Sequence, residues 1–192
     1  MTSFVSEVRV YVGRARTFRR DDWVAYLAWV GLMGGLFASS FAFLLAGRAA
    51  GVVFPGEAWM VPSGAAIFAA SIAIDTIGHR TIYREEIAKA EGLLHQVTIF
   101  CGISSCLLLC AAYAHPSWFW VPAMVATVLS FGYSLFDEAF HWRRYTSGRA
   151  DRVEMWSHVG IMTGHGIMML GWWAWYFGGY SGVGETLAAL GG

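Results

Sequence analysis

The chain has 192 residues, of which 57% are hydrophobic, 16% are aromatic and only 14% are charged. With a mean hydropathy of +0.50, this composition excludes an ordinary soluble globular protein. The length is that of one domain, and the formal net charge of zero hides an asymmetry, because the basic residues are clustered.

Residues 1–22 form a basic N-terminal segment that we expect in the cytoplasm. Apolar and basic positions alternate in it with some amphipathic character, which allows it to lie along anionic headgroups. A charged tail that only sets membrane orientation is an equal alternative. The apolar run that follows is of full membrane-spanning length, so we expect an anchor that is retained rather than a cleaved signal peptide.

Five apolar stretches follow, each long enough to cross about 30 Å of hydrocarbon as a helix. They cover roughly residues 23–47, 59–81, 90–114, 117–140 and 154–178. We therefore predict an all-α integral membrane protein whose residues 23–192 form a single transmembrane domain. Basic residues gather before the first span, between the second and third, and between the fourth and fifth, which predicts a cytoplasmic N-terminus and an external C-terminus in a bacterial-type inner membrane.

The second and third spans resemble the fourth and fifth. The pattern D-x-x-x-H-x-x-x-Y occurs at residues 75–83 and again at 137–145, and each copy is followed by E-x-x-x-H, at 91–95 and 154–158. Each copy is expected to form an antiparallel αα-hairpin, with both hairpins running in the same direction. We predict that these two duplicated hairpins form a four-helix bundle.

Residues four apart lie on one face of a helix, so every span of the repeat offers a carboxylate and an imidazole together. Within a hairpin, residues equally far from the turn lie at the same depth. This predicts four pairs, which are Asp75 with His95, His79 with Glu91, Asp137 with His158, and His141 with Glu154.

Facing hairpins would place these pairs around one centre, which is typical of a dinuclear metal site. An acidic side chain near the centre of a membrane helix costs about 2.5 to 3.5 kcal/mol, and coordination to a cation removes most of that cost. The alternative is solvation at the headgroups or hydrogen bonding to Arg80, Arg84, Arg143 and Arg144. The predicted ligands are Asp75, His79, Glu91, His95, Asp137, Glu138, His141, Glu154, His158 and His165.

Three further side chains are candidates for a catalytic role. Tyr83 and Tyr145 continue the two Asp/His faces by one turn, where they would donate to a metal-bound oxygen or mark the membrane interface. His165 lies two turns beyond His158 and is a candidate ligand, proton relay or axial haem ligand. A hydrogen bond from His165 to a neighbouring helix is the alternative.

Carboxylate and imidazole without thiolate suit iron, manganese or zinc, and histidine-rich subsets suit copper. Iron is the first choice here, copper or zinc the next, and haem the least favoured. The E-x-x-H spacing of Glu138 and His141 is typical of ferritin-like di-iron carboxylate four-helix bundles, which the chain resembles in ligand chemistry only.

A second resemblance covers about a fifth of the chain. Asp137-Glu138-x-x-His141, the later His158 and the run to Gly171-Trp172 are similar to the metal-binding stretch of the C subunit of particulate methane and ammonia monooxygenases. In that family an Asp or Asn three residues before one His, with a second His on the next helix, binds copper. Glu91 and Glu154 depart from that pattern. The resemblance implies oxygen chemistry rather than a particular substrate.

These observations favour a membrane-embedded, metal-dependent oxidoreductase, of hydroxylase, desaturase or oxidase type, acting on a lipid-soluble substrate or a quinol. An electron-donor protein or other membrane subunits would then be partners, beside the lipid bilayer itself. The alternatives are a b-type haem cytochrome subunit, a membrane metal transporter or assembly factor, and a zinc hydrolase. No nucleophile set and no nucleic-acid-binding pattern is evident in the sequence.

Overall fold

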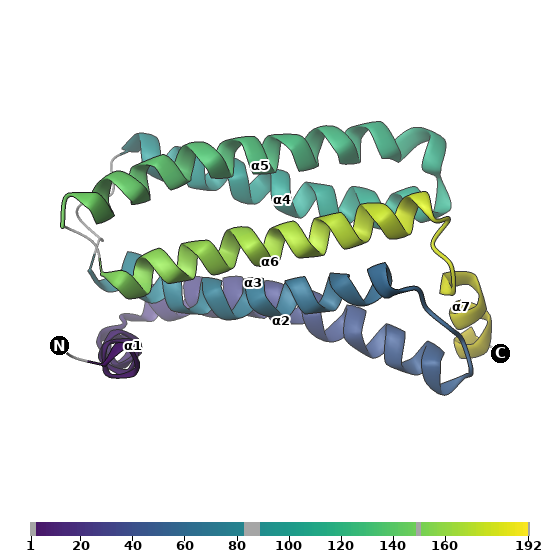
Figure 1. Cartoon of the computed structure of the whole chain (residues 1–192), viewed down its shortest axis with the longest axis horizontal. Helices are drawn as coiled ribbons and strands as arrows, with labels where there is room; N and C mark the ends of the chain where they lie inside the picture. The colour runs from purple at the N-terminus through teal and green to yellow at the C-terminus, as the bar shows by residue number, and fades with distance from the viewer. Residues whose placement is uncertain (1–2, 83–88, 149–150, 192) are drawn as a thin grey trace. The chain divides into compact units, whose positions relative to one another are not determined.

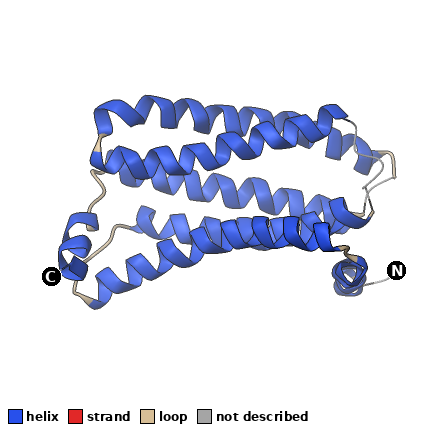
Figure 2. Cartoon of the chain, turned by 180° about the vertical axis from the view of Figure 1, so that it is seen from behind, coloured by secondary structure: helices blue, strands red, loops and turns tan. Residues whose placement is uncertain are grey.

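The computed structural model describes residues 3–82, 89–148 and 151–191, with the side chains of residues 89–91 outside the description. The described ranges contain helices and loops and no strand (Figures 1 and 2). The elements are α1 (Phe4–Gly13), a short 3-10 turn (Arg14–Thr17), α2 (Arg20–Ala49), α3 (Gly56–Thr81), α4 (Lys89–Ala114), α5 (Pro116–Thr146), α6 (Arg152–Phe177) and α7 (Val183–Gly191).

The five predicted spans coincide with the five long helices α2 to α6. Four of these, α2 to α5, are long and apolar enough to cross a membrane. Helix α6 is not among the four, because its histidines and its tryptophan-rich end lower its hydropathy. The chain is thus all-helical over its described residues and has the composition of a multi-pass membrane protein.

The chain divides into two compact units, and helices α2, α3 and α6 each contribute residues to both. The first unit holds Met1–Tyr26 and Ala73–Val159, and the second holds Leu27–Ile72 and Gly160–Gly192. The first unit contains both Asp/His motifs and both Glu/His motifs of the repeat. His165 belongs to the second unit.

Helices α4 and α5 form the hairpin of the first unit. They are joined at His115 and Pro116, where Pro occupies the first turn of α5 and leaves no helical hydrogen bond unmade. The two helices then run side by side (Figure 1). A side chain at Gly102 of α4 would lie 3.3 Å from the Ser130 hydroxyl of α5, so the helices approach closely along this interface.

Helix α1 packs onto the first unit through one buried residue. Ser3 caps this helix by accepting a hydrogen bond from the Ser6 amide. Tyr11, only 1% exposed, packs in a small apolar cluster with Ile77 of α3 and Val153 of α6. Arg152 donates to Glu7 at 2.7 Å, and these hydrogen bonds raise the pKa of the Arg152 guanidinium.

Glycines hold α3 and α6 together in the second unit. A Cβ added to Gly164 of α6 would lie 2.5 Å from the Phe68 amide nitrogen and 2.8 Å from the Gly64 carbonyl oxygen of α3. A Cβ at Gly171 would lie 2.8 Å from the Glu57 carbonyl oxygen. As the contacts move forward along α6 they move backward along α3, so the two helices are antiparallel. Such close backbone contact is the usual way in which membrane helices associate.

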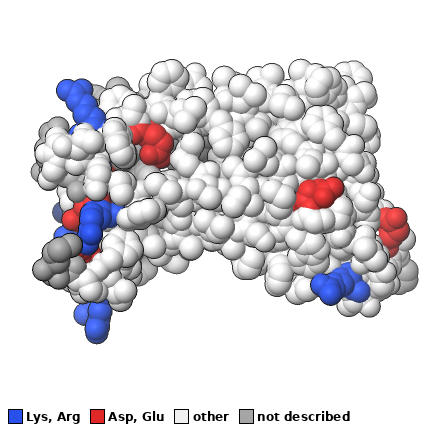
Figure 3. All heavy atoms as spheres, viewed as in Figure 1, with Lys and Arg blue, Asp and Glu red and all other residues white. Residues whose placement is uncertain are grey.

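The outward faces of the long helices are apolar. Large exposed side chains include Leu93, Phe100 and Leu107 on α4, and Leu135 and Phe136 on α5, each more than 60% exposed. On the face drawn in Figure 3, most atoms belong to uncharged residues. Apolar surface of this extent is suited to lipid and not to water.

Candidate metal centre

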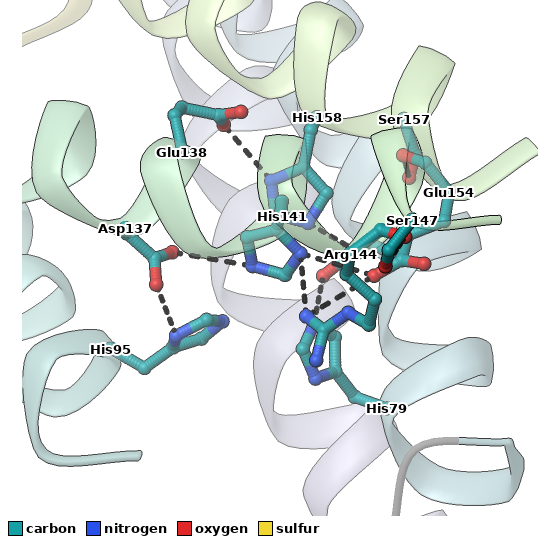
Figure 4. A network of polar contacts seen from close by, with 11 residues as sticks. His79, His95, Asp137, Glu138, His141, Arg144, Ser147, Glu154, Ser157 and His158 are labelled. Carbon is teal, nitrogen blue, oxygen red and sulfur yellow. Dashed lines mark hydrogen bonds and ion pairs between the residues drawn. The ribbon is translucent and has the colours of Figure 1, made fainter. Parts of the chain in front are cut away.

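Four helices bring acidic and histidine side chains of the repeat into one cluster within the first unit (Figure 4). Helix α3 supplies Asp75 and His79, α4 supplies His95, α5 supplies Asp137, Glu138 and His141, and α6 supplies Glu154 and His158. Helices α3, α5 and α6 each contribute two residues four positions apart on one face, as the spacing predicts. Asp75, Asp137, His141, Glu154 and His158 are all buried.

Asp137 lies between two histidines that come from two different helices. Its Oδ1 is 2.9 Å from Nδ1 of His95 on α4, and its Oδ2 is 3.7 Å from Nε2 of His141, one turn further along α5. One carboxylate and two imidazoles thus converge from a single hairpin. His95, Asp137 and His141 form a group whose ligand atoms lie within 4.8 Å of one another, and we call it the first centre.

Asp75 has the same arrangement in the other copy of the repeat. Its Oδ1 is 2.9 Å from Nε2 of His158 on α6, and its Oδ2 is 3.4 Å from Nε2 of His79, one turn further along α3. The four ligand atoms of His79, His141, Glu154 and His158 also lie within 4.8 Å of one another. We call this group, with Asp75 beside it, the second centre.

The histidine partners of the two aspartates differ from the prediction. His158 rather than His95 lies beside Asp75, and His95 rather than His158 lies beside Asp137. The physical reason is helix pairing, since α4 packs on α5 and the glycine contacts join α3 to α6. Each Asp/His helix therefore meets the Glu/His helix of the other copy. The predicted pair of His141 with Glu154 is confirmed at 3.0 Å.

Glu138 and Glu154 each contact the Nδ1 atom of a histidine ring in the cluster. Glu138 Oε1 lies 2.9 Å from His158 Nδ1, and Glu154 Oε1 lies 3.0 Å from His141 Nδ1. In both rings Nε2 then faces an aspartate. A carboxylate that accepts from one ring nitrogen fixes the orientation of the ring and leaves the other nitrogen for a metal. Glu138, predicted as a ligand, lies where it orients His158.

Several buried polar atoms of the cluster face one another without hydrogen-bond geometry. Among the described residues, Asp75 Oδ1, His95 Nδ1, Asp137 Oδ1 and His158 Nε2 are buried and lack hydrogen-bond geometry, although the facing atoms of each pair are 2.9 Å apart and form an ion pair when the imidazole is protonated. Such atoms are costly to bury unless something else satisfies them. A cation bound between carboxylate oxygen and imidazole nitrogen would do so, and both residue types are suitable ligands. The side chains therefore fit a metal.

Arg144 is a buried member of the cluster. Its Nη2 lies 2.9 Å from His141 Nδ1 and 3.4 Å from Glu154 Oε1. Of the other arginines weighed as hydrogen-bond partners, Arg80 approaches Asp22 at 3.9 Å, Arg143 is exposed, and Arg84 lies outside the described residues. Sequence reasoning grouped these arginines together. The three-residue spacing of His141 and Arg144 on one helix is the signal that singles out Arg144.

The remaining predicted residues are placed as follows. Tyr83 and the Glu91 side chain lie outside the described residues, and so does the predicted pair of Glu91 with His79. The Tyr145 ring contacts Trp142 on its own helix. His165 is buried in the second unit with its ring stacked on Phe68, and neither candidate metal group includes it. His115 precedes α5 at the turn.

Comparison of the chain with protein-family models, with curated protein sequences and with solved structures found no match.

Proposed function

We propose that this chain is a membrane-embedded, metal-dependent oxidoreductase of hydroxylase, desaturase or oxidase type. Its reaction centre would be a dinuclear His/carboxylate site near the cytoplasmic face, and its substrate would be lipid-soluble. The observation that carries the proposal is the pair of buried aspartates, each 2.9 Å from a histidine of another helix without hydrogen-bond geometry. Two such arrangements within one group of four helices favour two metal ions.

Different residues of the chain would have different roles in holding such a centre. The two aspartates and His79, His95, His141 and His158 would bind the metals. Glu138 would orient His158, and Glu154 would bind metal or orient His141. A bound transition metal supplies electron transfer or activation of oxygen, which these side chains do not perform alone.

The surroundings of the site support a lipid-soluble substrate. The exposed side chains of α4 and α5 are largely apolar, so these helices are suited to contact lipid, in which such a substrate dissolves. Electrons would come from quinol or from a partner protein. We further propose that α6 is the fifth span, that the two copies arose as duplicated hairpins, and that the N-terminus is cytoplasmic in an inner membrane.

Elemental analysis with the optical spectrum of the purified protein tests this proposal. We expect stoichiometric iron or copper, close to two per chain, and a spectrum without a Soret band. A Soret band would instead establish a haem cytochrome, and zinc as the bound metal would indicate a hydrolase. Protein purified under metal-replete conditions that holds no metal would contradict the proposal.

A further inference from the structure

Helix α1 lies across the direction of the long helices of the first unit. Figures 1 and 2 show it nearly end-on, whereas α4 and α5 run lengthwise across the page. Its buried Tyr11 packs against Ile77, near the end of α3, and against Val153, in the first turn of α6. Helix α3 is long and apolar enough to cross a membrane, and a spanning helix ends near the headgroups. A helix packed across that end lies along the membrane surface.

The face of α1 that is turned away from Tyr11 combines apolar and basic side chains. Val5, Arg9 and Val12 are four and three residues apart, so they share one face of the helix, and all three are exposed. Helices that lie in a membrane interface have this character, with apolar side chains at the boundary of the acyl chains and basic side chains among the headgroups. The long stem of Arg9 allows its guanidinium to reach a phosphate while the two valines contact lipid.

The charges around α1 favour an anionic partner. Exposed arginines continue from α1 through the 3-10 turn to the start of α2, at positions 9, 16, 19 and 20. Two acidic side chains beside α1 already have basic partners, since Glu7 lies 2.7 Å from Arg152 and Asp151 lies 3.8 Å from Arg14. Asp21 is exposed in the first turn of α2, where the helix dipole favours a negative charge. The exposed arginines are thus available to anionic headgroups.

Aromatic rings fix the depth of the junction between α1 and α2. Phe18, Trp23 and Tyr26 pack edge to face, with ring centroids 5.1 to 5.9 Å apart, and Trp23 is exposed. Tryptophan and tyrosine are enriched where a membrane meets water. Helix α2 continues from this aromatic group as a candidate membrane span. Arg16 and Arg19 are within a few residues of the group, so they are held at the depth of the headgroups.

We propose that α1 and the turn after it form a binding surface for anionic phospholipid headgroups, in which Arg9 and Arg16 contact the phosphates while Val5 and Val12 contact lipid. Bound lipid holds α1 in place, and through Tyr11 it supports the ends of α3 and α6. The surface depends on insertion of the chain in a membrane and not on a bound metal ion.

The test is hydrogen exchange of the α1 amides in the full chain, reconstituted in nanodiscs. One bilayer is phosphatidylcholine alone, and the other is phosphatidylcholine and phosphatidylglycerol in equal parts. We expect the wild-type α1 amides to exchange more slowly in the anionic bilayer, because bound lipid opposes the opening of the helix. Added salt should reduce this difference, since it screens the attraction between arginine and phosphate.

Substitution of single arginines separates lipid binding from folding. Arg9→Gln and Arg16→Gln should each make the α1 amides exchange about fivefold faster in the anionic bilayer, which is the contribution of one basic side chain near such a surface. Neither should change exchange in the neutral bilayer. Arg48→Gln is the control, because it removes an exposed charge from the far end of α2, and it should behave as the wild type does in both bilayers.

Tyr11→Ala shows what a purely structural effect looks like. It removes the contact with the first unit and should speed the exchange of α1 in both bilayers. Equal exchange of the wild-type α1 amides in the two bilayers would overturn the lipid-binding surface. So would an Arg9→Gln protein that, like Tyr11→Ala, exchanges faster in both. These measurements need no bound metal, so absence of metal from the protein would leave their outcome unchanged.

Discussion

Asp75 on α3 lies 2.9 Å from His158 on α6, with Oδ1 facing Nε2. These residues belong to different copies of the repeat, and the matching contact joins Asp137 to His95. Neither copy therefore contains a complete set of aspartate and histidines by itself. A centre built in this way requires helices from both copies to be packed together before it can bind an ion.

His95 and His158, each of which contacts the aspartate of the other copy of the repeat, should both be needed to bind metal. We expect His95→Ala to empty the first centre and His158→Ala to empty the second, since each removes the nitrogen nearest to an aspartate. Elemental analysis should show the loss of about one metal per chain in either variant. His115→Ala, at the turn before α5, is the control and should keep the full content. Full metal content in both site variants would show that the ligand set is wrong.

Glu138 should act on the second centre through the orientation of His158. Glu138→Gln removes the charge that lies 2.9 Å from His158 Nδ1 but leaves the metal-facing nitrogen in place. Loss of an orienting carboxylate commonly weakens metal binding by about 10- to 100-fold, so Co²⁺ titration should show weaker binding of one ion and unchanged binding of the other.

The control for this variant is Glu185→Gln, an exposed glutamate on α7. It should bind both ions as the wild type does. If Glu138→Gln lost one ion completely, Glu138 would be a ligand, as the sequence alone predicts.

Replacement of Gly164 by alanine should destabilise the folded protein, although alanine adds only one methyl group. In Gly164→Ala the new methyl group would lie 2.5 Å from the Phe68 nitrogen, which is backbone and cannot rotate away. We expect destabilisation of about 1 to 3 kcal/mol, measured as thermal or denaturant unfolding in detergent. Gly166→Ala is the matched control, because nothing lies within 4 Å of its added Cβ.

The two substitutions should therefore have different effects on the free energy of unfolding. In a helix interior alanine is favoured over glycine by about 1 kcal/mol, so Gly166→Ala should be neutral or stabilising. Equal stability of the two alanine variants would mean that α3 and α6 do not approach as closely as described.

The attachment of α1 should depend on Tyr11 much more than on its ion pair. Tyr11 is 1% exposed in the apolar cluster, and truncation of a large buried aromatic residue to Ala costs about 3 to 5 kcal/mol. Arg152 and Glu7 form an exposed ion pair, of a kind that contributes little to stability. Limited proteolysis should release the N-terminal segment rapidly from Tyr11→Ala and slowly from Arg152→Gln. Equal cleavage rates would contradict this assignment.

Local patterns were sufficient to predict the helices and most of the side chains that lie together in the cluster, although the predicted ligand His165 lies in the second unit and the Glu91 side chain lies outside the described residues. The five long helices follow from apolar runs, and the four-residue spacing correctly places Asp75 with His79 and Asp137 with His141 on shared faces. Both are properties of a single helix, whose period of 3.6 residues is the same in any environment. The pair of His141 with Glu154 was also predicted correctly.

Which histidine each aspartate meets was decided by tertiary packing. Every long helix here is largely apolar around its circumference, so hydropathy does not indicate which neighbour a given face contacts. The choice instead depends on where two backbones can approach, as at Gly164 beside Phe68, and that complementarity involves residues far apart in the chain. The sequence by itself therefore determined which side chains share a helix face. The packing of α3 with α6 and of α4 with α5 determined that His158 meets Asp75, that His95 meets Asp137, and that Arg144 lies between His141 and Glu154.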